Sequence, residues 1–354
     1  MKGLNTMKKN KLLAGILALT VGAVSLTACG NVDENSSAKD EDSELQPFRV
    51  AVMTDSGEQY AVYIGMEQGI FEKYGLDISV AEYAYGINTM DAVQNGTADT
   101  GDLADFALVN RIGNTLEGTN LVVYSELSGG TGYDTTGGLY VSAEYVDNLQ
   151  GLTESKGIIG NVGTATEYQN YIALTYIGVD ADAVPNVNSG DVSTSLALIQ
   201  KGDASAVVAS GSTARRYEEY GMVLVATSEE IGVATRSYLL TTDEILSEKA
   251  DLLAAYLNGL EESVQYISDN LDEVTPIISQ KFSIEEDDFI STWTNLQFNL
   301  GFTEAGAEKL EDIGKWAYEH GKYDTEYNIR DFIDTTAAVL AFGEDSDKIT
   351  VQLS

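Results

Sequence analysis

Side chains that can hydrogen-bond a small molecule recur in short segments of this sequence. Each segment follows a run typical of a buried strand, and most precede a run typical of a helix, so the polar groups would lie at strand ends and helix starts. We expect a ligand to be contacted by Asp55, Ser56, Glu58, Gln59, Tyr60, Tyr85, Asn88, Asp102, Asp105, Asp134, Thr164, Thr166, Glu167, Asn188, Ser210, Ser212 and Arg236.

Two kinds of ligand fit these residue types. The N–H groups at helix starts suit an anionic group, for which Arg236 is the main cationic candidate. The carboxylates outnumber the cations, however, and tyrosines lie among them, which favours an amine-bearing or heteroaromatic ligand. A third interpretation is that each hydroxyl or acid only caps its own helix.

The residue types that catalysis or metal binding would need are scarce. The 354 residues contain one histidine, His320, and one cysteine, Cys29, and no phosphate-binding, zinc-protease or nucleophile-elbow motif. We therefore expect a protein that is not an enzyme and that needs no cofactor and no metal.

The segment 48–80 predicts the elements that would position the first of these groups. An apolar run at 50–53 is typical of a buried strand, a helix pattern follows and ends at Gly75, and 76–80 is typical of a second strand. Ser56 and Gln59 have the spacing of a capping box at the helix start. Such a unit builds a parallel sheet covered by helices.

A second unit of the same kind follows at 157–179, with Thr164 and Glu167 as its capping box. The segments downstream of the two units, 92–113 and 197–221, also resemble each other in their order of helix end, glycine turn and small-residue strand. The repeat predicts two similar α/β lobes with a ligand cleft between facing loops.

The N-terminal residues 1–28 have the pattern of a secretory signal, with lysines before an apolar stretch that is short for a membrane span. Leu26-Thr-Ala-Cys29 matches a lipobox, which predicts lipid attachment at Cys29. The alternative is a plain secretory signal with an incidental cysteine. Residues 29–46 are acidic and poor in large apolar residues, which predicts a flexible tether.

The charge excludes some partners. The formal net charge is −36, and residues 1–28 contain four lysines and no acid, which leaves about −40 after their removal. A protein of this charge is not expected to bind nucleic acid or an anionic membrane surface.

These features together resemble the solute-binding lipoproteins of ATP-driven importers, in the nitrate/sulfonate/taurine and thiamine-precursor group. The resemblance rests on the lipobox, RVAVMTDSGEQYAVYIGMEQGIFEKYGLDISV, NGTADTGD, GIIGNVGTATEYQ and IQKGDASAVVAS in this order, and covers about 48–266. It implies a type II periplasmic-binding-protein fold with a hinge cleft. Lobe 1 would comprise 47–134 with 238–354, and lobe 2 would comprise 135–237.

The same resemblance implies a function. The protein would be a monomeric receptor, lipid-anchored to the cell membrane and facing outside the cytoplasm. It would deliver a small organic solute to an ABC permease and its ATPase. A sulfonate- or nitrate-type anion as ligand, a sensor without a transporter, and an enzyme on the same fold are the alternatives.

The C-terminal region is predicted to be helical from Thr242 onward, with further helices at 285–300, 303–320 and 329–342. Trp293 and Trp316 lie on these patterns, and we expect them to pack in the core rather than to hold a ligand.

Replacing Cys29 with Ser tests the lipid anchor. The variant lacks the thiol to which lipid would attach, so we expect it in the soluble fraction, whereas Ser37→Ala, the control, should stay with the membranes. Immunoblots of salt-washed membranes and supernatants measure this. A Cys29→Ser protein that remains on washed membranes would show that the anchor is wrongly assigned.

Overall fold

A computed structural model describes residues 44–54, 56–129, 137–232 and 234–353. The lipobox and nearly all of the tether lie outside the described residues. Residues 43–354 form one compact unit. Within the described ranges, no helix is long and apolar enough to cross a membrane.

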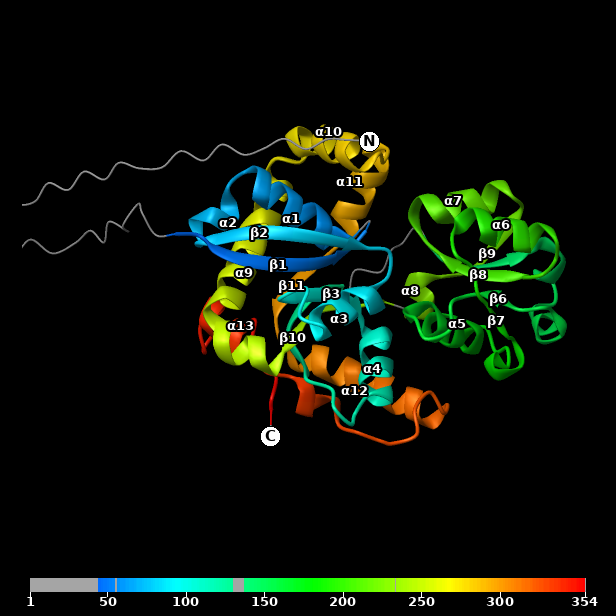
Figure 1. The fold of residues 1–354 in the computed structure, drawn as a ribbon. Coiled ribbons are helices and arrows are strands. Elements are labelled where there is room, and N and C mark those ends of the chain that lie inside the picture. Colours follow the sequence, from blue (N-terminus) through cyan, green and yellow to red (C-terminus); the bar gives the residue numbers. More distant parts are fainter. Residues whose placement is uncertain (1–43, 55, 130–136, 233, 354) are drawn as a thin grey trace, which may run out of the picture. The chain divides into compact units, whose positions relative to one another are not determined.

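The first part of the chain and its C-terminal region share a six-stranded mixed sheet (Figure 1). Its strands, in spatial order, are β11 (Phe298–Gly301), β4 (Leu121–Ser128), β10 (Ser237–Thr242), β3 (Thr100–Ala104), β1 (Gln46–Met53) and β2 (Leu76–Tyr83). β1 pairs in parallel with β2 and β3, as the strand–helix–strand pattern predicts, and β10 pairs antiparallel with β3 and β4.

Helices cover both faces of this sheet because β1 is buried on both sides. Phe48, Val50 and Val52 face one apolar core, and Ala51 faces the other. The first core is closed by α1 (Gly57–Glu67), α2 (Ile70–Lys73), α9 (Asp243–Asp269), α10 (Leu271–Phe282), α11 (Glu286–Asn295) and α13 (Thr336–Phe342). The second is closed by α3 (Gly86–Gln94), α4 (Asp105–Asn114), α12 (Glu304–Glu319) and the 3₁₀ helix η4 (Ile329–Phe332).

The middle of the chain forms a separate five-stranded sheet (Figure 1). Its order is β7 (Asn186–Val187), β6 (Ile158–Ile159), β8 (Ala206–Ala209), β5 (Gly138–Ser142) and β9 (Met222–Thr227). One core packs on α5 (Ala165–Tyr176), α8 (Ser228–Ile231) and η2 (Leu149–Glu154), near η1 (Ala143–Tyr145) and η3 (Ala181–Ala183). The other core packs on α6 (Val192–Gln200) and α7 (Gly211–Glu219). The strands before and after the predicted lobe boundaries thus belong to different sheets.

The two predicted capping boxes differ in outcome. Ser56 is the N-cap of α1, and its Oγ accepts a hydrogen bond from the backbone N–H of Gln59 at 3.1 Å, as predicted. Thr164 is the N-cap of α5, but its hydroxyl donates to the carbonyl of Asn161 instead of capping the helix. The second box is therefore wrong, because the Glu167 N–H donates to the Thr164 carbonyl and the Glu167 carboxylate accepts from the Gly163 N–H instead of from Thr164.

Two of the predicted C-terminal helices also need correction. The one predicted over 285–300 ends at Asn295, and 298–301 is strand β11, which pairs with β4. Gly301 has a φ of 113° and its backbone lies against Lys348, a geometry that a helix does not offer. The one predicted over 329–342 divides into η4 and α13.

Asp99, which directly precedes β3, connects this strand with β1 and with helix α9. Its carboxylate, which is 1% exposed, accepts hydrogen bonds from the backbone and guanidinium of Arg49 on β1 and from Lys249 Nζ at 2.7 Å. Lys249 has non-helical φ and ψ, which kinks α9 where it reaches Asp99. Burial raises the Asp99 pKa, but the bonds from Arg49 and Lys249 outweigh burial and hold the pKa below 3.8.

Asp99→Asn is expected to lower the free energy of unfolding at pH 7 by about 1.5–3 kcal/mol, because hydrogen bonds to a charged group are lost. The folded protein holds this pKa below its unfolded value, so the parent's advantage is present at pH 7 and disappears as the pH falls below about 4. Urea unfolding followed by circular dichroism at pH 7 and pH 3 measures both effects. The control is Asp77→Asn, on the exposed side of β2. Equal stability of the Asp99 and Asp77 variants at pH 7 would contradict the role of Asp99.

Candidate functional site

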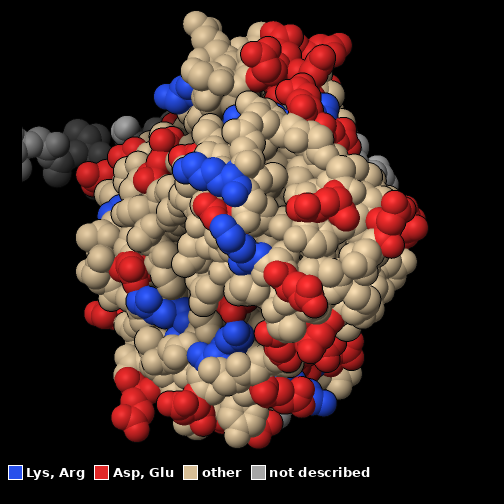
Figure 2. Space-filling view, turned by 90° about the vertical axis from the view of Figure 1, so that its right-hand side faces the viewer, with Lys and Arg blue, Asp and Glu red and all other residues tan. Residues whose placement is uncertain are grey.

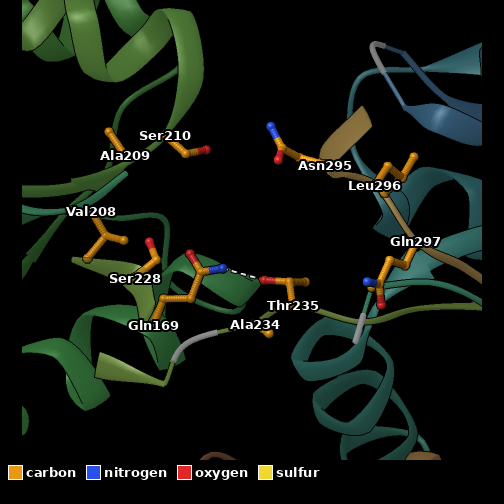
Figure 3. A pocket seen from close by; sticks show the side chains of 11 residues that line it. Gln169, Val208, Ala209, Ser210, Ser228, Ala234, Thr235, Asn295, Leu296 and Gln297 are labelled. Carbon is orange, nitrogen blue, oxygen red and sulfur yellow. Dashed lines mark hydrogen bonds between the residues drawn. The ribbon is translucent and has the colours of Figure 1, made fainter. Parts of the chain in front are cut away.

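A cavity of about 250 Å³ is lined by elements of both sheets (Figure 3). Gln169 of α5 and two serines at helix starts, Ser210 and Ser228, lie on one side, and the segment 295–297 between α11 and β11 lies on the other. Thr235 lies between them and accepts a hydrogen bond from Gln169 Nε2. The full lining is Gly129, Gln169, Val208, Ala209, Ser210, Ser228, Ala234, Thr235, Asn295, Leu296 and Gln297. We call this the interlobe pocket.

The lining of the interlobe pocket is polar but carries no ionisable side chain among the described residues. Three amides and three hydroxyls can each donate and accept hydrogen bonds. Ser210 is the N-cap of α7, yet its side chain makes no capping hydrogen bond. The first N–H groups of this nine-residue helix therefore keep their capacity to bind an acceptor or anionic group.

Gly129 brings the end of β4 against the segment that leads back into β10. Its φ is 95°, and a Cβ at this position would overlap the carbonyl of Thr235. The Gly129 N–H donates to the carbonyl of Gln297 at 2.8 Å, and Asn299 donates to the Gly129 carbonyl. Only a glycine satisfies both the backbone angle and the close approach. The base of the pocket is thus closed by backbone.

The start of α1, which the sequence places in the ligand cleft, does not line the interlobe pocket. Leu296 covers it, and a Cβ at Gly57 would overlap Leu296 Cδ2. Ser56 caps the helix and Gln59 is buried. Tyr60 packs edge-on to Phe289 and borders a different hollow, beside α11.

Glu58 and Asp102 form a buried acid pair behind the start of α1. Each is 1% exposed. Glu58 Oε1 accepts a hydrogen bond from the Tyr256 hydroxyl at 2.5 Å, and Asp102 Oδ1 accepts one from the Met53 N–H at 2.9 Å. The remaining oxygens, Glu58 Oε2 and Asp102 Oδ2, have no partner among the described residues. Burial and the Asp102 charge raise the pKa of Glu58 well above its ordinary value, and burial raises the pKa of Asp102 to about 7.

The side chains of Asp105 and Arg236 form hydrogen bonds or ion pairs with other residues of the protein. Asp105 begins α4 and accepts hydrogen bonds from the backbone N–H groups of Phe106 and Arg236. Burial, only partly offset by these bonds, raises the pKa of Asp105. The Arg236 guanidinium forms an ion pair with Glu126 at 2.7 Å. The cation that the sequence offers to an anionic ligand thus neutralises a buried acid of β4.

Glu167 is likewise paired within the protein. Its Oε1 lies 2.6 Å from Lys322 Nζ, and its Oε2 accepts from the Gly163 N–H at 2.7 Å. Thr166 accepts from the Asn161 N–H and shares a hydrogen bond with Thr164. The loop before α5 is therefore largely bonded to itself.

Three predicted residues are brought together elsewhere, in an open groove. Tyr85, Thr164 and Asn188 line it, and the Tyr85 hydroxyl donates to the carbonyl of Gly190 at 3.2 Å. Asn88 is exposed on α3, whose N-cap is Tyr85. Asp55, Asp134 and the Ser212 side chain lie outside the described residues.

Of the predicted residues that the structure describes, only Ser210 lines the interlobe pocket. The sequence analysis missed Gln169, Ser228, Thr235, Asn295 and Gln297. Thr227-x-x-Glu230, which includes Ser228, is a complete capping box and gave a usable signal for a helix start. The segment 295–297 gave no such signal, since its pattern continues that of the helix before it.

The described ranges contain no group of three or more His, Cys, Asp and Glu side chains placed to hold an ion. His320, at the end of α12, instead stacks on Trp316, with ring centroids 4.6 Å apart.

A scan of protein families and a search of curated proteins found no match. Solved structures with a similar fold include the periplasmic aliphatic sulphonate-binding protein SsuA from Escherichia coli, with 13% identity, a TM-score of 0.67 and coverage of 81% of this chain and 92% of that chain. The ligand-binding component of an ABC-type import system from Staphylococcus aureus, with zinc bound, has 10% identity, a TM-score of 0.64 and coverage of 84% and 100%. A mutant of DszB in complex with biphenyl-2-sulfinic acid has 10% identity, a TM-score of 0.54 and coverage of 82% and 98%. These likenesses confirm the predicted α/β periplasmic-binding-protein fold.

The buried acid pair makes stability depend on pH. Because the folded protein raises the Asp102 pKa from 3.8 to about 7, the free energy of unfolding should fall as the pH rises between about 4 and 7. Glu58→Gln leaves Asp102 as the one acid of the pair and replaces the other carboxyl by a neutral amide that can donate a hydrogen bond, so its urea midpoint should change less over this range and equal or exceed that of the parent at pH 8. Glu67→Gln, exposed on the same helix, is the control. A Glu58→Gln profile that parallels the parent's would contradict this account.

Proposed function

We propose that this protein is an extracytoplasmic receptor that captures a small polar organic solute in the interlobe pocket and delivers it to an ABC permease. The observation that carries the proposal is a cavity lined by residues of both sheets and furnished with six uncharged hydrogen-bonding side chains. Cavities built this way enclose polar solutes and can open by a hinge between the parts that line them. Proteins with a similar fold, SsuA among them, bind solutes.

The ligand is proposed to present an acidic or other acceptor-rich group to the start of α7. The sequence favours an amine-bearing ligand because of its acidic loops. In the structure, however, Asp105 and Glu167 have internal partners, and Glu58 and Asp102 are buried away from the interlobe pocket. An uncharged lining with an uncapped helix start suits an acceptor better than a cation.

The membrane attachment and the partner follow from the sequence. Lipid on Cys29 would hold the protein on the outer side of the cell membrane, within reach of a permease and its ATPase. The face drawn in Figure 2 carries many Asp and Glu side chains, with Lys and Arg gathered in a band across its middle. A predominantly acidic surface of this kind keeps an anchored protein soluble.

An enzymatic function has one point in its favour, since DszB, with a similar fold, is an enzyme. The lining of the interlobe pocket does not favour it here. Among the described residues that line it, there is no histidine, cysteine, lysine or acid that could serve as the base of its serines or threonine.

A thermal-shift screen followed by calorimetry tests the receptor function. Alkanesulfonates, nitrate, carboxylates, polyamines, pyrimidines and amino acids are added to the purified protein. A true ligand at a hundred times its dissociation constant stabilises the folded state by about 2.7 kcal/mol. We expect stabilisation by an acceptor-bearing compound, and absence of any stabilising compound would overturn the proposal.

Ser210→Asp tests the sign of the ligand. Asp also caps helices, so the fold should be kept, while its negative charge lies at the start of α7. We expect the affinity for an acidic ligand to fall about tenfold or more, which is about 1.4 kcal/mol or more. Asn328→Asp adds the same charge at the exposed N-cap of η4 and should leave the affinity unchanged. Tighter binding of an amine by Ser210→Asp would establish the amine-bearing ligand instead.

A further inference from the structure

A second cavity, of about 370 Å³, lies against another side of α5. Gln169 lines the interlobe pocket, and its neighbour Asn170 lines this one. Successive helix residues point about 100° apart, which explains how one helix borders both. The volume falls at the lower end of the range for small-molecule sites. We call it the α12 pocket, because Trp316 and His320 of α12 form one wall.

The wall from α12 is a rigid aromatic cluster. Trp316 stacks on His320 and meets Tyr171 of α5 at 5.0 Å between ring centroids. His320 Nδ1 is 2.8 Å from the carbonyl of Trp316, one turn earlier, which fixes the imidazole ring. The same cavity is lined by the apolar side chains of Leu174 and Val184 and by two acids, Glu167 and Asp182.

Two buried polar atoms at this cavity have no partner among the described residues. They are the indole Nε1 of Trp316, a donor, and the amide Oδ1 of Asn170, an acceptor. Asn170 is 1% exposed, so its oxygen is shielded from bulk solvent. Leaving a buried donor or acceptor unpaired costs stability, and native proteins nearly always satisfy such groups.

The orientation of the Asn170 amide is well determined by its surroundings. Its Nδ2 donates to the carbonyl of Ile159 at 2.9 Å and to Asn186 Oδ1 at 2.7 Å. Both partners are acceptors, so exchanging the amide oxygen and nitrogen would place an oxygen against them. The atom without a partner, Asn170 Oδ1, is therefore a hydrogen-bond acceptor that has no donor among the described residues.

The donor side of the cavity also carries a positive charge. Lys322 Nζ lies 5.7 Å from the centroid of the Trp316 ring and 2.6 Å from Glu167 Oε1. An ammonium group has three N–H donors, so Lys322 keeps donor capacity beyond this ion pair. The indole N–H and the ammonium together suit a carboxylate, while Asn170 Oδ1 suits an amine.

We propose that the α12 pocket is a second binding site, for a small zwitterion of the free amino-acid class. The carboxylate of the bound molecule accepts hydrogen bonds from Trp316 Nε1 and Lys322 Nζ. Its ammonium group donates to Asn170 Oδ1, and its side chain lies on Leu174 and Val184. The site does not depend on the ligand of the interlobe pocket.

Fluorescence of a single tryptophan tests the proposal directly. Trp293→Phe leaves Trp316 as the only tryptophan of the chain. The variant is titrated with each of the twenty L-amino acids except tryptophan. For any amino acid that binds, the matching acid without the amine and amine without the acid are also titrated. We expect a saturable change in Trp316 emission with at least one amino acid and not with its two fragments. No saturable change with any amino acid, or equal binding of a fragment, would overturn the proposal.

Variants in the otherwise natural chain, measured by calorimetry, locate the site. Trp316→Phe keeps an aromatic ring but removes the N–H donor together with the second ring of the indole, and Lys322→Met removes the charge. Each should weaken binding about ten- to a hundredfold, as expected for a hydrogen bond to a charged group. Lys315→Met, an exposed neighbour on α12, and Ser210→Asp in the interlobe pocket should bind like the parent. Unchanged affinity in both Trp316→Phe and Lys322→Met would overturn the site, whatever the interlobe pocket binds.

Discussion

Much of the structure depends on how the buried carboxylate of Glu126 is neutralised. Glu126 lies on β4, 1% exposed, and its two oxygens serve different elements. Oε2 pairs with Arg236, and Oε1 accepts from the N–H and hydroxyl of Thr303, the N-cap of α12. Arg236 also exchanges two hydrogen bonds with Asp105, since its N–H donates to the Asp105 carboxylate and its carbonyl accepts from the Asp105 N–H. One charge thus ties together β4, the start of α4, the entry to β10 and the start of α12. Breaking such a pair would leave a buried charge uncompensated, which is strongly destabilising.

The ion pairs between this protein's few cations and its own acids explain why the described lining of the interlobe pocket has no cation. A chain with 56 acidic and 20 basic residues has few cations to spare. Four of them form ion pairs with acids of the protein itself, namely Arg236, Lys322, Arg49 and Lys249. A ligand in the proposed site would then meet neutral amides, hydroxyls and the N–H groups of a helix start among the described residues. Such groups bind through geometry more than through net charge, so selectivity depends on how many hydrogen bonds a solute completes.

The fold was predictable where its signal is local. Nearby residues alone determine the first strand–helix–strand unit. They are the apolar run around Val50, the cap at Ser56 and Gly75, which precedes β2. The pocket was not predictable in the same way. Asn295 and Gln297 line the same pocket as Ser210 because β11 pairs with β4, which turns the chain after α11. Nor could sequence reveal that Leu296 lies over Gly57, or that Arg236 is used by Glu126, since these contacts join residues distant in the chain.

The contact of Gly129 with Thr235 constrains how the pocket could open. Because the end of β4 touches the segment leading into β10, these two pieces of backbone cannot bend independently of each other. Any methyl group at position 129 would push these two pieces of backbone apart, so the close packing of the two segments depends on the smallest residue available to the chain.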